Sequence, residues 1–120
     1  MASFEEHCQD CERLLGKPYE KVNKWMDELY ARFGPLHRFW RHHTRGVREA
    51  RGIFGFEGGQ AATIHILKDC GSIPTPRDWE EHAVDSLGIN IHSTFKGYWD
   101  PARFDCEAKK YLARYELYNS

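Results

Sequence analysis

The chain has 120 residues and a formal net charge of −1, a length that suits one domain with its own core and is too short for two. Its seven Phe, six Tyr and four Trp can fill that core without disulfides. No stretch approaches the roughly 18 consecutive apolar residues of a membrane span, and the acidic N-terminus lacks the basic and apolar regions of a signal peptide. We therefore expect a cytoplasmic protein with a single domain (1–120), no membrane partner and four reduced cysteines.

The first part of the chain predicts two helices. Ser3 and Glu6 have the spacing of a capping box, and apolar residues then recur at helical intervals until Gly16 ends the helix. A second helix is expected from Pro18 to Phe33, because its apolar residues follow the pattern i, i+3, i+4, i+7.

The middle of the chain predicts a longer basic helix and a short apolar one. The basic helix is expected from Pro35 to Arg51, with proline in its first turn and Gly52 after its end. Residues 53–59 are rich in glycine and predict a connector. Residues 60–70 then predict a helix closed by Gly71, although their β-branched residues leave a strand open as an alternative.

The last third predicts two more helices. Thr75 is expected to cap a helix from Pro76 to about Leu87, and residues 89–99 to form a loop or a short extended segment. Asp100-Pro101 then opens a C-terminal helix. The chain as a whole predicts an all-α fold, an irregular single-domain bundle of five to six helices.

Positive charge is concentrated in residues 32–51, which hold six arginines and one glutamate. At ~100° per residue, the expected basic helix places its apolar residues on one side and four arginines on the other. A patch of this kind on a nearly neutral protein indicates a small anionic ligand such as a nucleotide; the alternative is a solvated face with ordinary ion pairs. The four arginines are Arg38, Arg41, Arg45 and Arg48.

Histidines in three expected helices point to a metal centre. The helical pattern puts His43 among apolar side chains, where each unsatisfied ring nitrogen would cost about 1–3 kcal/mol. His65 and Asp69 share one side of their element whether it is a helix or a strand, which suits joint metal ligation. Such nitrogen and oxygen donors suit a divalent transition metal, Zn, Mn, Fe or Ni. The expected ligands are His7, His42, His43, His65 and Asp69.

Structural interpretations compete with each of these assignments. His43 could be a core histidine satisfied by hydrogen bonds, and His65 with Asp69 a surface pair or a local hydrogen bond. Cys8 and Cys11 favour two small apolar residues over a zinc site, because the chain has no second pair of ligands with matching spacing.

Several short motifs resemble a small family of uncharacterised proteins from bacterial and phage genomes. The resemblance spans roughly residues 5–80 and implies a compact helical fold and a bacterial or bacteriophage origin, without an assigned activity. The chain has a weaker likeness to HD-type metal phosphohydrolases, helical enzymes with His and Asp ligands on successive helices; it departs from them in having His42-His43 where they have a His-Asp doublet. The motifs are Trp25-x-Asp27, His37-Arg38, Arg41-His42-His43-x-x-Gly46, Phe54-Gly55, His65-x-x-x-Asp69-x-Gly71 and Ile73-Pro74-x-x-x-Asp78-Trp79.

The leading hypothesis is a metal-dependent hydrolase of a nucleotide or related phosphate ester. In this hypothesis Arg38, Arg41 and Arg45 hold the phosphate, and His37 and His42 serve acid–base catalysis. The alternative is a non-catalytic protein that sequesters a nucleotide with the same arginines or blocks a host defence protein. A third interpretation, a helix lying on nucleic acid, conflicts with the near-neutral charge. The sequence leaves the substrate and a homo-oligomeric state open.

Overall fold

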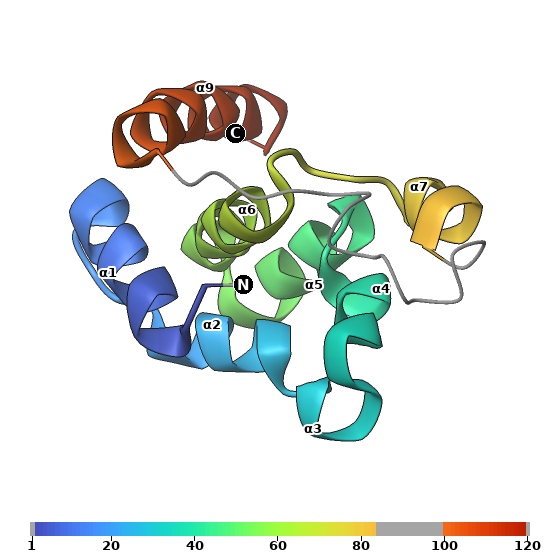
Figure 1. Cartoon of the computed structure of the whole chain (residues 1–120). Coiled ribbons are helices and arrows are strands. Elements are labelled where there is room, and N and C mark those ends of the chain that lie inside the picture. The colour runs from blue at the N-terminus through green and yellow to red at the C-terminus, as the bar shows by residue number, and fades with distance from the viewer. Residues whose placement is uncertain (1, 84–99, 120) are drawn as a thin grey trace.

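The computed structural model describes residues 2–83 and 100–119, and for residues 35, 36, 82 and 83 the backbone alone. These residues form helices joined by short connections, and no strand occurs among them (Figure 1), which confirms the predicted all-α class. In chain order the elements are α1 (Phe4–Leu15), α2 (Glu20–Asp27), α3 (Tyr30–Phe33), the 3₁₀ turn η1 (Gly34–His37), α4 (Arg38–Arg41), α5 (Thr44–Phe54), α6 (Phe56–Cys70), α7 (Pro76–Asp78), the π-helical turn η2 (Trp79–Ala83) and α9 (Pro101–Asn119).

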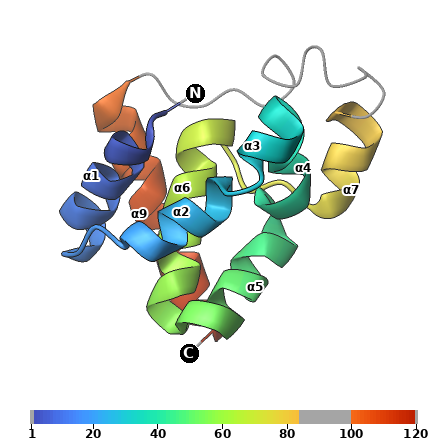
Figure 2. The same ribbon diagram turned by 90° about the horizontal axis from the view of Figure 1, so that it is seen from below.

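Helix α6 lies at the centre of the bundle and packs against α1, α2, α5 and α9 (Figures 1 and 2). Because neighbours surround it, almost every side chain from Gly58 to Cys70 is buried. A helix enclosed in this way is expected to be apolar on all sides. His65 and Asp69 are therefore polar groups placed inside the core, each nearly inaccessible to solvent.

The predicted caps are confirmed at both ends of α1 and at the C-terminal end of α6. The Ser3 hydroxyl accepts a hydrogen bond from the Glu6 amide at 3.1 Å, and the Glu6 carboxylate accepts one from the Ser3 amide at 3.4 Å. Gly16 and Gly71 end their helices in the left-handed conformation, with φ of 89° and 77°. Residues 60–70 are helical, which excludes the strand alternative. The helix begins at Phe56, however, so the predicted connector 53–59 is wrong.

The predicted second helix, Pro18–Phe33, is helical over most of its length but not continuous, because α2 ends at Asp27 and helical structure resumes only in α3, from Tyr30 to Phe33. At that point the Arg41 guanidinium donates to the Trp25 carbonyl oxygen at 2.6 Å and to a Glu28 carboxylate oxygen at 2.7 Å. The Trp25 carbonyl thus accepts from a residue distant in sequence as well as from the Glu28 amide, which lies 3.4 Å away. This early end leaves Asp27 at the C-terminus of α2.

The predicted basic helix, Pro35–Arg51, is also wrong as one continuous helix. It is interrupted at His42 and His43, between the end of α4 and the start of α5. His43 is fully extended, with φ of −160° and ψ of 177°, and caps α5 by accepting a hydrogen bond from the Gly46 amide at 3.1 Å. A residue distant in sequence stabilises this interruption, since the Trp79 indole N–H donates to the His42 carbonyl oxygen at 2.6 Å. The four-arginine face therefore does not exist, and Arg38 is buried.

Two glycines of α5 offer a test of this break. A methyl group at Gly46 would overlap the backbone carbonyl of Arg41, whereas one at Gly52 would enter open space. We expect Gly46→Ala to lower the free energy of unfolding by about 2–3 kcal/mol. Gly52→Ala, inside the helix that in fact runs to Phe54, should raise it by about 0.5–1 kcal/mol. Urea unfolding measures both, and equal stability of the two variants would contradict the close approach of α5 to the end of α4.

The C-terminal part agrees with the sequence where the structure describes it. Thr75 caps α7 in a capping box with Asp78, and α9 opens at Pro101 as predicted. The rest of the predicted helix to Leu87 and the segment 89–99 lie outside the described residues. No described helix is long and apolar enough to cross a membrane.

Candidate metal centre

Four side chains from three parts of the chain meet beside α6. Asp27 comes from the end of α2, His42 from the break after α4, and His65 and Asp69 from successive turns of α6. One ligand atom from each lies within 4.8 Å of all the others. Three of the four residues are buried, and Asp27 keeps 28% of its side chain exposed. These four residues could hold a metal ion.

The distances between these donor atoms are those of ligands around one ion. His42 Nε2 lies 3.2 Å from Asp69 Oδ2 and 3.6 Å from Asp27 Oδ1. His65 Nε2 lies 3.5 Å from the same Asp69 oxygen and 3.2 Å from the same Asp27 oxygen. Four ligands placed tetrahedrally about 2.0–2.2 Å from an ion stand about 3.3–3.6 Å apart. The four histidine–carboxylate separations agree with this spacing, and the remaining separations lie within 4.8 Å.

Asn23 fixes which nitrogen of His65 carries the proton. The Asn23 amide nitrogen donates to the carbonyl oxygens of Pro18 and Tyr19, at 3.0 and 3.2 Å. Its oxygen, 2.9 Å from His65 Nδ1, must therefore accept, and Nδ1 must donate. In the neutral ring Nε2 then bears the lone pair. That lone pair faces oxygens of Asp27 and Asp69. These electron-rich atoms repel one another, and a cation bound between them would stabilise the arrangement.

The ionisation states in the centre favour the same conclusion. Burial lowers the pKa of His65, and it lowers the pKa of His42 to about 3, so both rings are neutral near pH 7. Burial alone would raise the pKa of Asp27 and of Asp69, but the neighbouring imidazoles outweigh it and lower both. Two carboxylates and two neutral imidazoles are the forms in which these side chains bind metals.

The second oxygen of Asp69 is held by groups outside this set of four. His7 Nε2 lies 3.3 Å from Asp69 Oδ1, the Ala2 amide donates to it at 3.4 Å, and an Arg38 nitrogen lies 3.7 Å away. The His7 ring stacks on His65, with centroids 3.5 Å apart. Neither His7 nitrogen has a hydrogen bond within the described residues, although the ring is fully buried. The structure thus places His7 beside the centre, against Asp69 and the His65 ring.

His37 supports the centre from the Asp27 side. Its Nδ1 lies 2.8 Å from the Gly34 carbonyl oxygen, and its Nε2 lies 2.9 Å from Asp27 Oδ1. Both neighbours are hydrogen-bond acceptors, so the His37 ring is placed to donate to each of them. His37 therefore lies against the outer edge of the centre, in contact with Asp27.

His43, Arg41 and Arg45 do not join the cluster. His43 Nδ1 accepts from the Gly46 amide, and burial lowers the pKa of this ring. Arg41 is engaged by Glu28 and by the Trp25 ring, which lies 4.1 Å from its guanidinium carbon. Arg45 is exposed and shares a separate cavity of about 340 Å³ with His43. Of the arginines expected to hold phosphate, only Arg38 reaches the centre.

Asp27 and Asn23 were not among the predicted site residues, and the structure brings both into the cluster. A signal for them exists: they stand four residues apart, as His65 and Asp69 do, and share a helix face. They also alternate with Val22 and Met26, two buried residues of the core. Polar residues inside an apolar stripe indicate a buried polar contact.

Together these features define an all-α protein with a buried centre of histidine and aspartate. A comparison with known families matches residues 2–86 to the family described as Domain of unknown function (DUF6915), and the chain belongs to this family. The match includes every residue of the centre and ends before α9. It confirms the expected membership of an uncharacterised family and gives no link to HD-type enzymes. No curated protein and no solved structure matches the chain.

Proposed function

We propose that this protein is a metal-dependent hydrolase that acts on a small phosphate ester. The observation that carries the proposal is the convergence of Asp27, His42, His65 and Asp69, with donor atoms spaced as around one ion. In this proposal these four residues are the ligands, and His7 orients Asp69. Mixed nitrogen and oxygen donors suit Zn, Mn, Fe or Ni.

Charge around the centre supports an anionic substrate. A divalent ion would balance the two carboxylates of Asp27 and Asp69. The Arg38 guanidinium beside Asp69 and the His37 ring beside Asp27 would then add hydrogen-bond donors next to the ion. A phosphate group is the common substrate group that such donors stabilise, because charge develops on its oxygens during transfer.

Each residue has a distinct role in this proposal. A bound metal ion would polarise a phosphoryl oxygen and make its bound water acidic. Arg38 would stabilise negative charge on the phosphate, and His37 would donate its Nε2 proton to the departing oxygen. Asp27 is the most exposed of the four ligands, so we place the approach of substrate at the end of α2.

The first test is hydrolysis of p-nitrophenyl phosphate and bis(p-nitrophenyl) phosphate by protein loaded with Zn, Mn, Fe or Ni in turn. We expect turnover with at least one metal and loss of turnover after chelation. With metal supplied in excess so that the centre stays filled, His37→Gln should lower turnover by about 100-fold or more, because loss of a general acid typically costs 10²–10⁴-fold. Arg32→Gln, an exposed arginine outside the centre, is the matched control and should retain full activity.

Two results would separate the parts of the proposal. Protein that binds one equivalent of metal but converts neither ester, nor a panel of nucleotides, would overturn the hydrolase and leave the metal centre standing. Turnover that survives both chelation and the substitution of His65 by alanine would point to a contaminating enzyme and contradict the proposal.

A further inference from the structure

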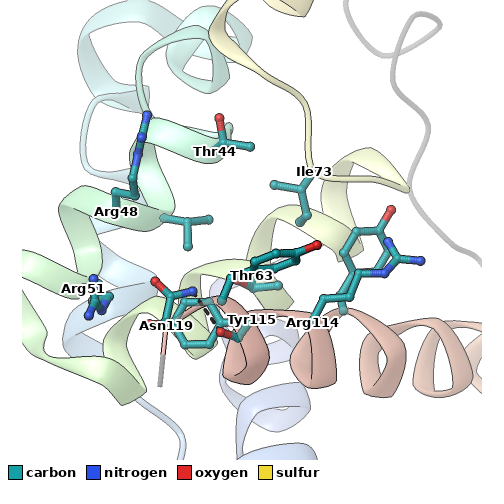
Figure 3. A pocket seen from close by; sticks show the side chains of 11 residues that line it. Thr44, Arg48, Arg51, Thr63, Ile73, Arg114, Tyr115 and Asn119 are labelled. Carbon is teal, nitrogen blue, oxygen red and sulfur yellow. Dashed lines mark hydrogen bonds between the residues drawn. The ribbon is translucent and has the colours of Figure 1, made fainter.

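A second candidate site lies on the other side of α6 from the metal centre. A cavity of about 500 Å³ opens between α5 and α9, with Thr63 of α6 among its lining residues (Figure 3). Thr63 and His65 are two residues apart, about 200° around the helix, so they face opposite sides. The cavity and the centre therefore share α6 without sharing a side chain. Its volume is in the range of small-molecule sites, about 300–1,000 Å³.

Three arginines give this cavity an unbalanced positive charge. Arg48 and Arg51 come from α5 and Arg114 from α9, and Figure 3 shows them on two sides of the cavity. All three are exposed, and no described carboxylate lies within ion-pair distance of any of them. No aspartate or glutamate lines the cavity among the described residues.

The cavity that holds Arg45 makes the contrast clear. There Arg41 and Arg45 stand with Glu49 and Glu80 in the same lining, so the charges of that cavity are balanced. Arginines that have carboxylates beside them need no other anion. The cavity between α5 and α9 lacks such carboxylates among the residues that the structure describes, and an anionic ligand would supply the missing charge.

Three tyrosines make the same cavity suitable for a planar ring. Tyr111 packs under the Arg114 guanidinium, with 5.1 Å between its centroid and the guanidinium carbon. Tyr115 is fixed, because its hydroxyl donates to the Phe56 carbonyl oxygen at 2.7 Å. Tyr118 keeps 82% of its surface exposed, so its ring can cover a ligand. Aromatic rings and guanidinium planes are the surfaces on which nucleobases stack.

We propose that the cavity between α5 and α9 binds a mononucleotide, with Arg48, Arg51 and Arg114 around the phosphate and the tyrosines against the base. A ligand with one ring and one phosphate group uses both features of the lining. Inorganic phosphate would leave the tyrosines uncovered, and a nucleoside would leave the arginines without an anion. This site stands apart from the proposed hydrolase, since it includes none of the residues of the metal centre.

The test is calorimetric titration of the full chain with adenosine and guanosine monophosphates, in the presence of a chelator. Inorganic phosphate, adenosine and a single-stranded oligonucleotide are titrated in parallel. We expect one mononucleotide per chain, bound at least about 10-fold more tightly than phosphate or adenosine, because stacking and charged hydrogen bonds both contribute. The double variant R51Q/R114Q should bind the mononucleotide at least about 10-fold more weakly.

Two further variants keep this test decisive. Arg32→Gln changes one exposed arginine outside the cavity and should bind as the unmodified protein does. Tyr118→Ala changes an exposed ring and should weaken mononucleotide binding but not phosphate binding. No mononucleotide binding at millimolar concentration, unchanged binding by R51Q/R114Q, or tighter binding of the oligonucleotide would each overturn the proposal. Because a chelator is present throughout, failure here leaves the metal-dependent hydrolase untouched, and the reverse holds.

Discussion

Replacement of Asp69 by asparagine is expected to lower the affinity of the protein for a divalent transition metal by more than about 100-fold, because loss even of a group that only orients a ligand costs 10–100-fold. Asp69 faces His42 and His65 through one oxygen, and His7 and Arg38 through the other. Asparagine keeps the shape of the side chain and removes the negative charge. The Asp69→Asn substitution therefore tests whether the negative charge of Asp69 binds the cation, while most of the packing around the side chain stays in place.

The measurement is competition with a chromogenic chelator for Zn or Mn. Asp105→Asn is the matched control, since Asp105 pairs with Arg13 at the surface, and its metal affinity should not change. Asp27→Asn repeats the experiment at the most exposed ligand, in case the buried variant does not fold. Wild-type affinity in both folded variants, judged by circular dichroism, would show that the carboxylates do not bind the metal.

Acidification is expected to destabilise the metal-free protein strongly between about pH 6.5 and pH 3, the interval between the ordinary and the folded pKa of His42. In this interval the unfolded chain binds a proton at His42 that the folded chain does not bind. Stability therefore falls as the pH falls, by about 1.4 kcal/mol per pH unit for such a group. His65, whose pKa burial also lowers, acts in the same direction.

The aspartates of the centre add to this loss at lower pH. The pKa values of Asp69 and Asp27 are lower in the folded protein than in the unfolded chain. Their ionised forms therefore add to the free energy of unfolding at pH values above the pKa of an unfolded aspartate, about 3.9. This added stability is lost as the pH falls through the pKa values of the folded protein. The described ionisable groups that face His42 are Asp69, Asp27, His37 and His65.

Urea unfolding in the presence of a chelator, at pH values from 7 to 4, measures this dependence. We expect a loss of several kcal/mol for the unmodified chain, which is a large part of the roughly 5–15 kcal/mol of a typical domain. His42→Gln should flatten the slope by about 1.4 kcal/mol per pH unit, while Asp105→Asn should not. An identical slope with and without His42 would mean that this ring is protonated in the folded protein.

The parts of the fold that the sequence predicted are those with local causes. The cap at Ser3 and the left-handed ends at Gly16 and Gly71 depend on neighbouring residues alone. The two breaks that it missed depend on distant partners. Arg41 binds the Trp25 carbonyl and ends α2, and Trp79 binds the His42 carbonyl where the basic segment turns. Helical periodicity carries no information about such contacts.

The same breaks explain which site residues could be anticipated. His65 and Asp69 share a regular helix, so their common face followed from spacing. His43 was expected on the inner face of a continuous helix, and the break turned it into the cap of α5. Arg38 was expected on an outer face and is buried beside Asp69. Asp27 was not predicted as a ligand, because its place at the centre depends on where α2 ends.

We expect one metal ion to lie among Asp27, His42, His65 and Asp69. The most direct measurement is an anomalous difference map from crystals of the purified protein, recorded at the absorption edge of the metal found in it. We expect one peak about 2.0–2.2 Å from His42 Nε2 and His65 Nε2, with Asp27 and Asp69 completing the coordination. Stoichiometric metal that gives its peak elsewhere, with these four side chains bonded only to one another, would contradict this expectation.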